Sequence, residues 1–367
     1  MLSRRAALAS LAMGAATLSP GALASAEIDD LDTRPGLAAL AAQRRILYGC
    51  AASTFELQND RFVAVLTHEA KLIVPEYEMK RAALEPQPGR YAFAPGDALV
   101  RFAHERGLAI RGHTLVWHKA NPPWLEQALS TPRKEQILTS FITDVVSRYR
   151  GQMHSWDVVN EALSPSDGRG DHLRQTLWLK ALGSGYIDLA FHAARAADPH
   201  ALLVYNDWGC EGAGPQHDRF RAATLDFLER AKTRGVPIGA YGMQGHLSAF
   251  GPPIDQRKLR EFLSRVQSLG LRILITEHDV DDAGGISDLA VRDQAVADAS
   301  RRFLDVVLEN NATIGVLTWG LSDRFLDPPG FQAKLMGYSP RMLPLDDNFR
   351  RKPMWRGMAE AFSLRGH

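Results

Sequence analysis

The feature that most constrains the fold is a regular alternation of short apolar, β-branched runs with longer stretches of helical periodicity. Such short runs predict buried strands, and the stretches between them predict helices. The predicted strands span residues 46–50, 71–74, 108–113, 155–159, 202–205, 238–243, 272–275 and 314–319. The predicted helices span residues 97–106, 131–150, 186–197, 216–234, 255–269 and 291–309.

Strands that alternate with helices pair in parallel through right-handed crossovers. Eight such units favour a closed barrel over an open sheet, so we predict an α/β fold, a single (β/α)8 TIM barrel. A chain of 367 residues could hold two domains, but barrels of this kind use the same length for one. No linker or low-complexity tract divides the sequence.

The first 26 residues predict an export signal. Arg4 and Arg5 precede an Ala- and Leu-rich stretch over residues 6–18, and Ala-Ser-Ala at 24–26 is a small-residue cleavage site. The paired arginines resemble a twin-arginine signal, and an ordinary secretory signal is the alternative. We therefore expect residues 27–367 to form an exported domain, periplasmic or secreted. The apolar run is too short to span a bilayer.

Charge and cysteine content narrow the possible partners. The chain has 43 basic and 42 acidic residues, a formal net charge of +1. A near-neutral surface argues against nucleic acid or an anionic membrane as a partner and suits a neutral polymer such as a glycan. We expect a monomer. Cys50 and Cys210 could form one bridge in an oxidising compartment, although two buried free thiols are the favoured interpretation.

Polar and aromatic residues gather at one end of the predicted strands. The carboxyl ends of barrel strands meet at one rim, where barrel enzymes place their chemistry. The residues found there are Glu76, His113, Trp117, His118, Asn160, Glu161, Asn206, Asp207, Gln244, His246, Glu277, Asp279 and Trp319. The opposite strand ends carry ordinary Arg, Lys and Gly. This asymmetry predicts an active site at the carboxyl rim.

Two glutamates are the strongest candidates within that set. Glu161 closes the fourth predicted strand and Glu277 closes the seventh, so the barrel places them across its mouth from each other. Hydrolysis of a sugar–sugar bond needs one protonated carboxyl group for the leaving oxygen and one ionised carboxylate for the anomeric carbon. A single glutamate at a strand end would more often be solvated or salt-bridged.

Neighbouring residues fit the same chemistry. Asn160 suits a donor to the sugar 2-hydroxyl group, with strand capping as the alternative. Trp117, Trp208 and Trp319 could be flat platforms for sugar rings, although Trp is also a common core residue. The remaining tryptophans are assigned to packing: Trp124, Trp156, Trp178 and Trp355.

A supporting pair of residues is also predicted. Asp279 lies two positions beyond Glu277 on an extended strand end, so the two side chains point the same way. Asp279 could therefore orient His246, which in turn could hydrogen-bond Glu277 and keep it ionised. His113, His118 and His246 could instead be metal ligands, but their spacing matches no ligand signature, so we predict no metal and no cofactor.

Together these motifs resemble glycoside hydrolase family 10, the endo-β-1,4-xylanases, from about Ile46 to Trp355. The most specific segments are residues 112–118, 156–161, 205–207, 244–246, 275–279 and 318–320.

The resemblance implies a retaining endo-β-1,4-xylanase that cleaves xylan by double displacement, with Glu161 as general acid/base and Glu277 as nucleophile. It implies that five residues surround the cleaved sugar, namely His113, Asn160, Gln244, His246 and Trp319. Glu76 and Lys80 would hold the next sugar outward, and we also expect Trp117 and Asn206 to bind substrate.

The sequence departs from the family pattern around this pair. Tyr77 stands where the family has Asn, Ala120 where it has Gln, and His278 where it has Leu. A second aromatic platform, a Ser-Trp after the eighth strand, is absent over residues 323–327. Three alternatives therefore stay open. They are a same-fold retaining glycosidase for another β-glycan or decorated glycoside, a glycan-binding barrel without catalysis, and a metal-dependent hydrolase.

Overall fold

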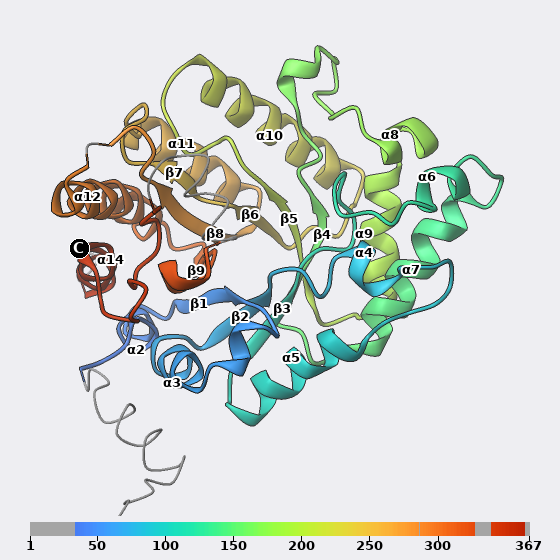
Figure 1. Ribbon diagram of the computed structural model, residues 1–367. Coiled ribbons are helices and arrows are strands. Elements are labelled where there is room, and N and C mark those ends of the chain that lie inside the picture. The colour runs from blue at the N-terminus through green and yellow to red at the C-terminus, as the bar shows by residue number, and fades with distance from the viewer. Residues whose placement is uncertain (1–33, 286, 327–338, 364–367) are drawn as a thin grey trace, which may run out of the picture. The chain divides into compact units, whose positions relative to one another are not determined.

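The sheet of this protein closes on itself. A computed structural model describes residues 34–285, 287–326 and 339–363. Its barrel strands are β1 (Leu47–Ala52), β2 (Leu72–Pro75), β3 (Ala109–Gly112), β4 (Ser155–Asn160), β5 (Leu202–Asp207), β6 (Ala240–Met243), β8 (Arg272–Asp281) and β9 (Thr313–Thr318). All neighbours pair in parallel, β6 pairs with β8, and β9 pairs with β1 (Figure 1). The predicted (β/α)8 barrel is confirmed, whereas the predicted signal, residues 1–26, lies outside the described residues.

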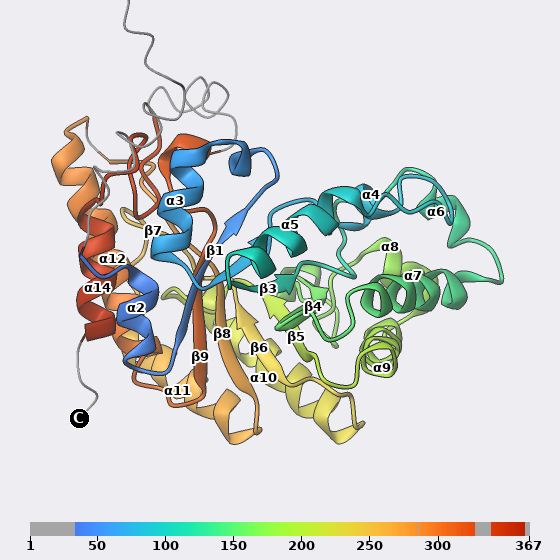
Figure 2. The ribbon, with the colours of Figure 1, turned by 90° about the horizontal axis from the view of Figure 1, so that it is seen from below.

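Helices cover the outside of the barrel (Figures 1 and 2). The long ones are α3 (Asp60–Glu69), α5 (Ala94–Glu105), α7 (Lys134–Arg148), α9 (Tyr186–Ala197), α10 (Pro215–Thr233), α11 (Gln256–Ser268), α12 (Leu289–Val307) and α14 (Pro353–Ser363). Shorter ones are α2 (Leu37–Ala42), α4 (Arg81–Leu84), α6 (Leu125–Ala128) and α8 (Leu177–Leu182). The six predicted helices are present, and the sequence analysis missed α3, α14 and the four short helices.

Strands covered on both faces explain the continuous apolar runs of the sequence. All six residues of β4 are buried, including Trp156, because neighbouring side chains cover the strand from inside and from outside the barrel. The predicted strand bounds agree within two residues except at β8, which ends at Asp281 rather than at Ile275. This extra length matters for the site, since a short additional strand, β7 (His246–Ser248), pairs with it.

The first and last described helices close the outer layer together. Helix α2 packs against α14 beside β1 (Figure 2). The buried carboxylate of Glu69 joins three segments there. It accepts hydrogen bonds from the Leu37 amide at 2.8 Å and from Trp355 Nε1 at 2.9 Å, and it pairs with Arg351 at 2.7 Å. The assignment of Trp355 to packing is confirmed.

The two cysteines do not form a bridge. Cys50 and Cys210 are free thiols, both fully buried. Burial raises the pKa of each thiol, that of Cys210 to about 12. Among the described residues, the helices are all too short or too polar to cross a bilayer.

Candidate active site

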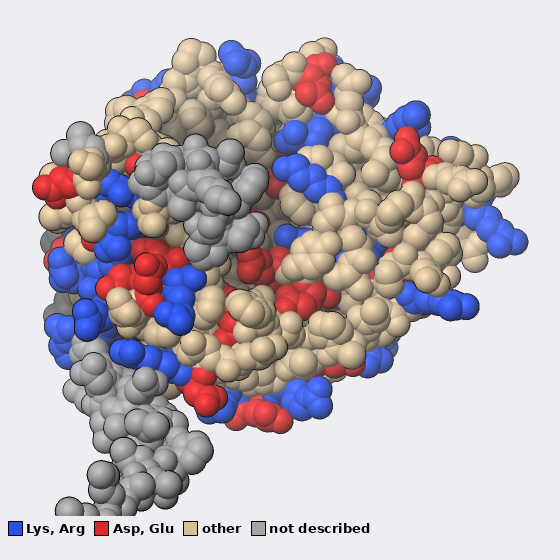
Figure 3. Space-filling view, viewed as in Figure 1, with Lys and Arg blue, Asp and Glu red and all other residues tan. Residues whose placement is uncertain are grey.

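The barrel brings the predicted site residues to one end. Glu161 follows β4, Asn206 is the second-last residue of β5, Gln244 follows β6, and Glu277 lies within β8. Acidic side chains lie in the hollow at the centre of the face shown in Figure 3, with mostly uncharged residues around it. The site therefore combines buried carboxylates with a largely neutral surrounding surface.

Glu277 is buried, with 6% of its surface exposed, and is surrounded by donors. Its Oε1 accepts a hydrogen bond from Asn206 Nδ2 at 2.8 Å, and its Oε2 lies 3.4 Å from His246 Nε2. Burial alone would raise the pKa of Glu277. The hydrogen bond from His246, the charges of His113 and His246, and the bond from Asn206 outweigh burial and lower this pKa to about 2. Glu277 is thus an ionised carboxylate over the ordinary pH range.

His246 is held by the extension of β8. β7 pairs with this extension so that His246 lies opposite Asp279, and His246 Nδ1 is 2.8 Å from Asp279 Oδ1. Burial lowers the pKa of His246, but the charges of Asp279 and Glu277 raise it well above its ordinary value. The contact from Asp279 through His246 to Glu277, expected from the spacing in the sequence, is present.

Glu161 lies at a strained turn directly after β4. Its φ of +55° is in the left-handed region, which non-glycine residues rarely adopt and which is concentrated at functional sites. The amide of Glu161 donates to the carbonyl oxygen of Asn206 at 2.9 Å. Arg174 Nε donates to the carbonyl oxygen of Glu161, also at 2.9 Å. Gln244 Nε2 donates to the carboxylate Oε1 at 3.2 Å. The backbone and the side chain are therefore both fixed.

Asn206 connects the two halves of the site. Thr276 Oγ1 donates to Asn206 Oδ1 at 2.7 Å, which leaves Asn206 Nδ2 as the donor to Glu277 and, at 2.9 Å, to Asn160 Oδ1. Gln244 Nε2 also contacts Asn160 Oδ1, at 3.3 Å. A chain of amide groups thus runs from one glutamate to the other across the mouth of the barrel.

The buried carboxylate of Asp157 positions the side chain of His113. Its Nδ1 lies 2.8 Å from Asp157 Oδ2, while the other oxygen of Asp157 pairs with Arg111. Since a carboxylate only accepts, Nδ1 carries the proton and Nε2 is left to face other partners. The ring packs edge to face on Trp319, with a centroid distance of 5.3 Å.

Lys80 stands between aromatic rings. Its Nζ lies 5.1 Å from the ring centroid of Trp117, 5.6 Å from that of Trp319 and 5.7 Å from that of Tyr77. Burial lowers the pKa of Lys80, while the carboxylates of Glu277, Glu76 and Glu161 oppose that shift. The ammonium group of Lys80 thus lies among three aromatic rings. It also interacts electrostatically with Glu161, Glu277 and Glu76, which follows β2.

Trp208 lines a separate cavity of about 780 Å³ beside the nucleophile candidate. His246 and Asp279 form the wall shared with the site, and Leu247 and Pro252 lie among its other lining residues. Its volume is in the range of pockets that hold small ligands. Of the tryptophans assigned to packing, Trp156 and Trp178 are fully buried and Trp124 is half-buried.

The sequence analysis missed several supporting residues. His118 was considered only as a possible metal ligand, but its Nδ1 lies 3.8 Å from Glu161 Oε2, and burial lowers its pKa to about 4. Asp157 received no role in the sequence analysis, because nothing in its own strand indicates its contacts with Arg111 and His113 of a neighbouring segment. The described residues contain no group of three or more His, Cys, Asp or Glu side chains suited to a metal ion.

Comparison with known proteins agrees with this geometry. The family model described as Glycosyl hydrolase family 10 matches residues 36–361. Endo-1,4-beta-xylanase B of Thermotoga neapolitana is 33% identical over 303 residues, which cover 82% of this chain and 83% of the relative. The crystal structure of xylanase 10B from Thermotoga petrophila RKU-1 in complex with xylobiose superposes with a TM-score of 0.81 at 31% identity, covering 90% of this chain and 98% of that one. A family 10 structure from Paenibacillus barcinonensis gives a TM-score of 0.79 at 31% identity, covering 91% and 99%.

Proposed function

Because this chain belongs to glycosyl hydrolase family 10, we propose that it hydrolyses the β-1,4-linked backbone of xylan, with Glu161 as general acid/base and Glu277 as nucleophile. The chain of amides that joins the two glutamates through Asn206 is the observation that carries this assignment. It links two carboxyl groups that have different surroundings, as distinct acid/base and nucleophile roles require.

The reaction proceeds in two displacements. Glu277 attacks the anomeric carbon while Glu161 donates its proton to the glycosidic oxygen, which leaves with the departing sugar chain. The product of this step is a glycosyl ester on Glu277. Glu161, now ionised, then takes a proton from a water molecule, which attacks the same carbon and releases Glu277. The anomeric configuration is retained.

The donors around Glu277 suit this cycle. Asn206 and His246 keep the carboxylate ionised and oriented before the attack. Asn160 is held by Asn206 and lies beside Glu161, where its amide can reach a sugar hydroxyl group. Trp319 and Trp117 offer flat faces to the C–H faces of sugar rings. The cavity lined by Trp208 adjoins the site at His246 and Asp279.

A second candidate substrate is a different or decorated β-glycan, and Tyr77 favours it. Its side chain is 52% exposed and its ring borders Lys80, at the position where the family pattern has an asparagine. Ala120, where the family pattern has a glutamine, lies against Ala82, since its carbonyl oxygen accepts from the Ala82 amide at 2.8 Å. An aromatic ring in place of two amides makes binding less dependent on the hydroxyl pattern of the next sugar outward.

Hydrolysis of a substrate panel tests both candidates. Wild type and Glu277→Ala are compared on xylan, mixed-linkage β-glucan, aryl xylosides and arabinose-decorated xylooligosaccharides. We expect wild type to prefer xylan and to release the β-anomer first by proton NMR, and we expect Glu277→Ala to be folded and inactive. Near wild-type activity of Glu277→Ala would reject the assignment. Binding without turnover by wild type would favour the non-catalytic alternative, and loss of activity with a chelator would favour the metal alternative.

The cellular location is part of the same proposal. A polymeric substrate such as xylan is met outside the cell, which supports the expectation that residues 1–26 direct export. We also propose that the chain acts as a monomer. N-terminal sequencing of the protein secreted or released from the periplasm would test the cleavage after Ala26.

A further inference from the structure

A fully buried histidine follows the proposed nucleophile in the chain and has no part in the proposed mechanism. His278 follows Glu277 in β8, and none of its surface is exposed. Its ring stacks on Phe303 of α12, with a centroid distance of 5.5 Å and an interplanar angle of 29°. The family pattern has a leucine at this position, which would fill the space without any polar contact.

Both ring nitrogens of His278 are engaged. Nδ1 lies 2.9 Å from the carbonyl oxygen of Gly245, and Nε2 lies 2.8 Å from Ser300 Oγ. A carbonyl oxygen can only accept, so Nδ1 carries the proton. Burial lowers the pKa of His278, and the neutral ring then accepts at Nε2 from the hydroxyl group of Ser300. The tautomer is therefore fixed by its two partners.

The partner of Nδ1 lies between two residues of the site. Gly245 separates Gln244, which donates to Glu161, from His246, which contacts Glu277. The amide of Gly245 is also held, since it donates to the buried carboxylate of Glu211 at 3.1 Å. The amide and the carbonyl group of this one residue are thus both anchored.

Gly245 depends on these anchors for its position, because a glycine backbone is conformationally permissive and no side chain fits here to hold it. Its φ is +81°, and a Cβ at this position would come within 2.9 Å of Ile275 Cγ2. The segment reaches the glutamates through contacts of 3.2 Å and 3.4 Å, which are near the upper limit for hydrogen bonds. A small displacement of the segment would therefore weaken the contacts to both carboxylates at once.

We propose that His278 is a positioning residue that fixes the Gln244–Gly245–His246 segment through its hydrogen bond to Gly245, and so sets the contacts of both catalytic glutamates. The proposal rests on the roles assigned to Glu161 and Glu277 under the proposed function. It assigns the histidine a different task from the leucine of the family pattern, which supports the same segment by packing alone.

Three substitutions separate the hydrogen bond from packing. His278→Leu removes both polar contacts and restores the family residue. His278→Asn places a donor near the position of Nδ1 and can keep the bond to Gly245. His278→Gln places its amide near Nε2 and can keep only the contact with Ser300. A matched control is His154→Leu, because His154 Nδ1 contacts Ser155 Oγ at 3.1 Å at the opposite end of the barrel.

Kinetics on an aryl xyloside, pH profiles and thermal unfolding are measured for each variant. We expect His278→Leu to lower kcat about 10-fold with little change in KM, since misplacement of catalytic groups acts on the chemical step. The acidic limb of its kcat/KM profile should move to higher pH, because the contact between His246 and Glu277 weakens. His278→Asn should recover most of kcat, and His278→Gln should not. His154→Leu should lower stability and leave kcat and the pH profile near wild type.

Equal kcat values and unmoved pH profiles in all three His278 variants, with only stability reduced, would overturn the proposal. If His278→Leu does not fold, the difference between the Asn and Gln variants still decides the question. Glu277→Ala, measured on the same substrate, separates a failure of the proposed catalytic roles from a failure of the positioning role of His278. An active Glu277→Ala rejects the assigned roles, whereas an inactive Glu277→Ala together with a fully active His278→Leu rejects the positioning role alone.

Discussion

Glu277 and Asp323 are both buried carboxyl groups on the same side of the barrel, yet their pKa values move in opposite directions. Asp323 follows β9 and pairs with Lys352 at 2.6 Å, but burial still raises its pKa to about 6. Glu277 has no lysine or arginine at that distance among the described residues, and its pKa falls to about 2. A cation at hydrogen-bond distance therefore does not by itself give a buried carboxyl group a low pKa here. At Glu277 the hydrogen bonds from His246 and Asn206 and the charges of His113 and His246 together outweigh burial.

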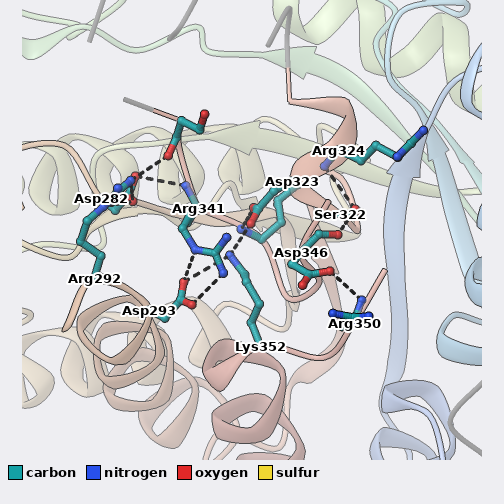
Figure 4. Close-up of polar contacts among 12 residues, drawn as sticks. Asp282, Arg292, Asp293, Ser322, Asp323, Arg324, Arg341, Asp346, Arg350 and Lys352 are labelled. Carbon is teal, nitrogen blue, oxygen red and sulfur yellow. Dashed lines mark hydrogen bonds and ion pairs between the residues drawn. The ribbon is translucent and has the colours of Figure 1, made fainter. Parts of the chain in front are cut away.

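Asp323 belongs to a structural group that we call the anchor cluster, drawn in Figure 4. The cluster consists of three ion pairs, which Figure 4 draws with neighbouring residues: Asp282 with Arg292, Asp293 with Arg341, and Asp323 with Lys352. The cluster ties α12 to the segment from Arg341 to Lys352 (Figure 4). Between Glu161 and Glu277, in contrast, the connecting groups are the neutral amides of Asn206, Asn160 and Gln244. The contrast agrees with a structural role for the anchor cluster and with the proposed catalytic role of the two glutamates.

Replacing the proposed proton donor tests the catalytic side of this comparison. Glu161→Ala should lower kcat/KM on xylan about 10²- to 10⁴-fold, the usual range for loss of general acid catalysis. An aryl xyloside with a leaving group that needs no protonation should lose far less. Thermal unfolding is the control and should change little, because Gln244 and Asn206 remain in place. Equal losses on both substrates would contradict the role of Glu161 as acid.

Removing one partner from the anchor cluster should show the reverse pattern. Lys352→Met leaves the buried Asp323 without its cation, and loss of one partner of a buried pair typically costs about 3–5 kcal/mol of stability. Urea unfolding measures this loss, and kcat of the folded enzyme at 25 °C should stay near wild type. A stable variant with low kcat would break the distinction between the anchor cluster and the two glutamates.

The pH profile sharpens the contrast between the two carboxyl groups. In the proposed mechanism Glu277 reacts as a carboxylate. Its low pKa keeps it ionised as the pH falls through 4.5, and it becomes protonated only near its pKa of about 2. We expect kcat/KM to show no loss assignable to Glu277 between pH 6 and about 4. His246→Ala removes a stabilising contact and should shift the acidic limb upward by about 1 pH unit. An acidic limb near pH 4.5 in the wild type would contradict the observed environment.

The smallest effect on stability and activity is expected when an ion pair at the protein surface is removed. Arg301 of α12 and Glu360 of α14 form an ion pair at 2.7 Å in which the glutamate side chain is 69% exposed. Exposed pairs contribute about 0–1 kcal/mol, so Arg301→Ala should change the free energy of unfolding by less than about 1 kcal/mol and leave kcat unaffected. A loss as large as that of Lys352→Met would mean that burial is not what separates the two kinds of pair.

The sequence predicted the barrel well because its strands are covered on both faces and therefore read as continuous apolar runs. The sequence analysis missed helices whose clearest signal is the capping residue. Asn59 caps helix α3, and its side chain accepts from the Phe62 amide at 2.9 Å. This capping signal before an apolar stripe is present in the sequence but did not enter the prediction.

The candidate site could be predicted where neighbours in sequence are neighbours in space. Asp279 and Glu277 share one strand, so their spacing fixed the direction of both side chains. The anchoring of His113 by Asp157 and of Gly245 by His278 joins different strands. Such pairs depend on the register between strands, which a single sequence does not contain. The extension of β8, which aligns His246 with Asp279, was missed for the same reason.

The two buried thiols have a practical consequence for handling this enzyme. Cys50 and Cys210 are separate, and burial disfavours the reactive thiolate at both positions. The described barrel therefore needs no oxidant to reach its final form, and dithiothreitol should leave its melting temperature and turnover unchanged. Production in a reducing cytoplasm, with no disulfide isomerase present, should yield the same active protein as production in an oxidising compartment.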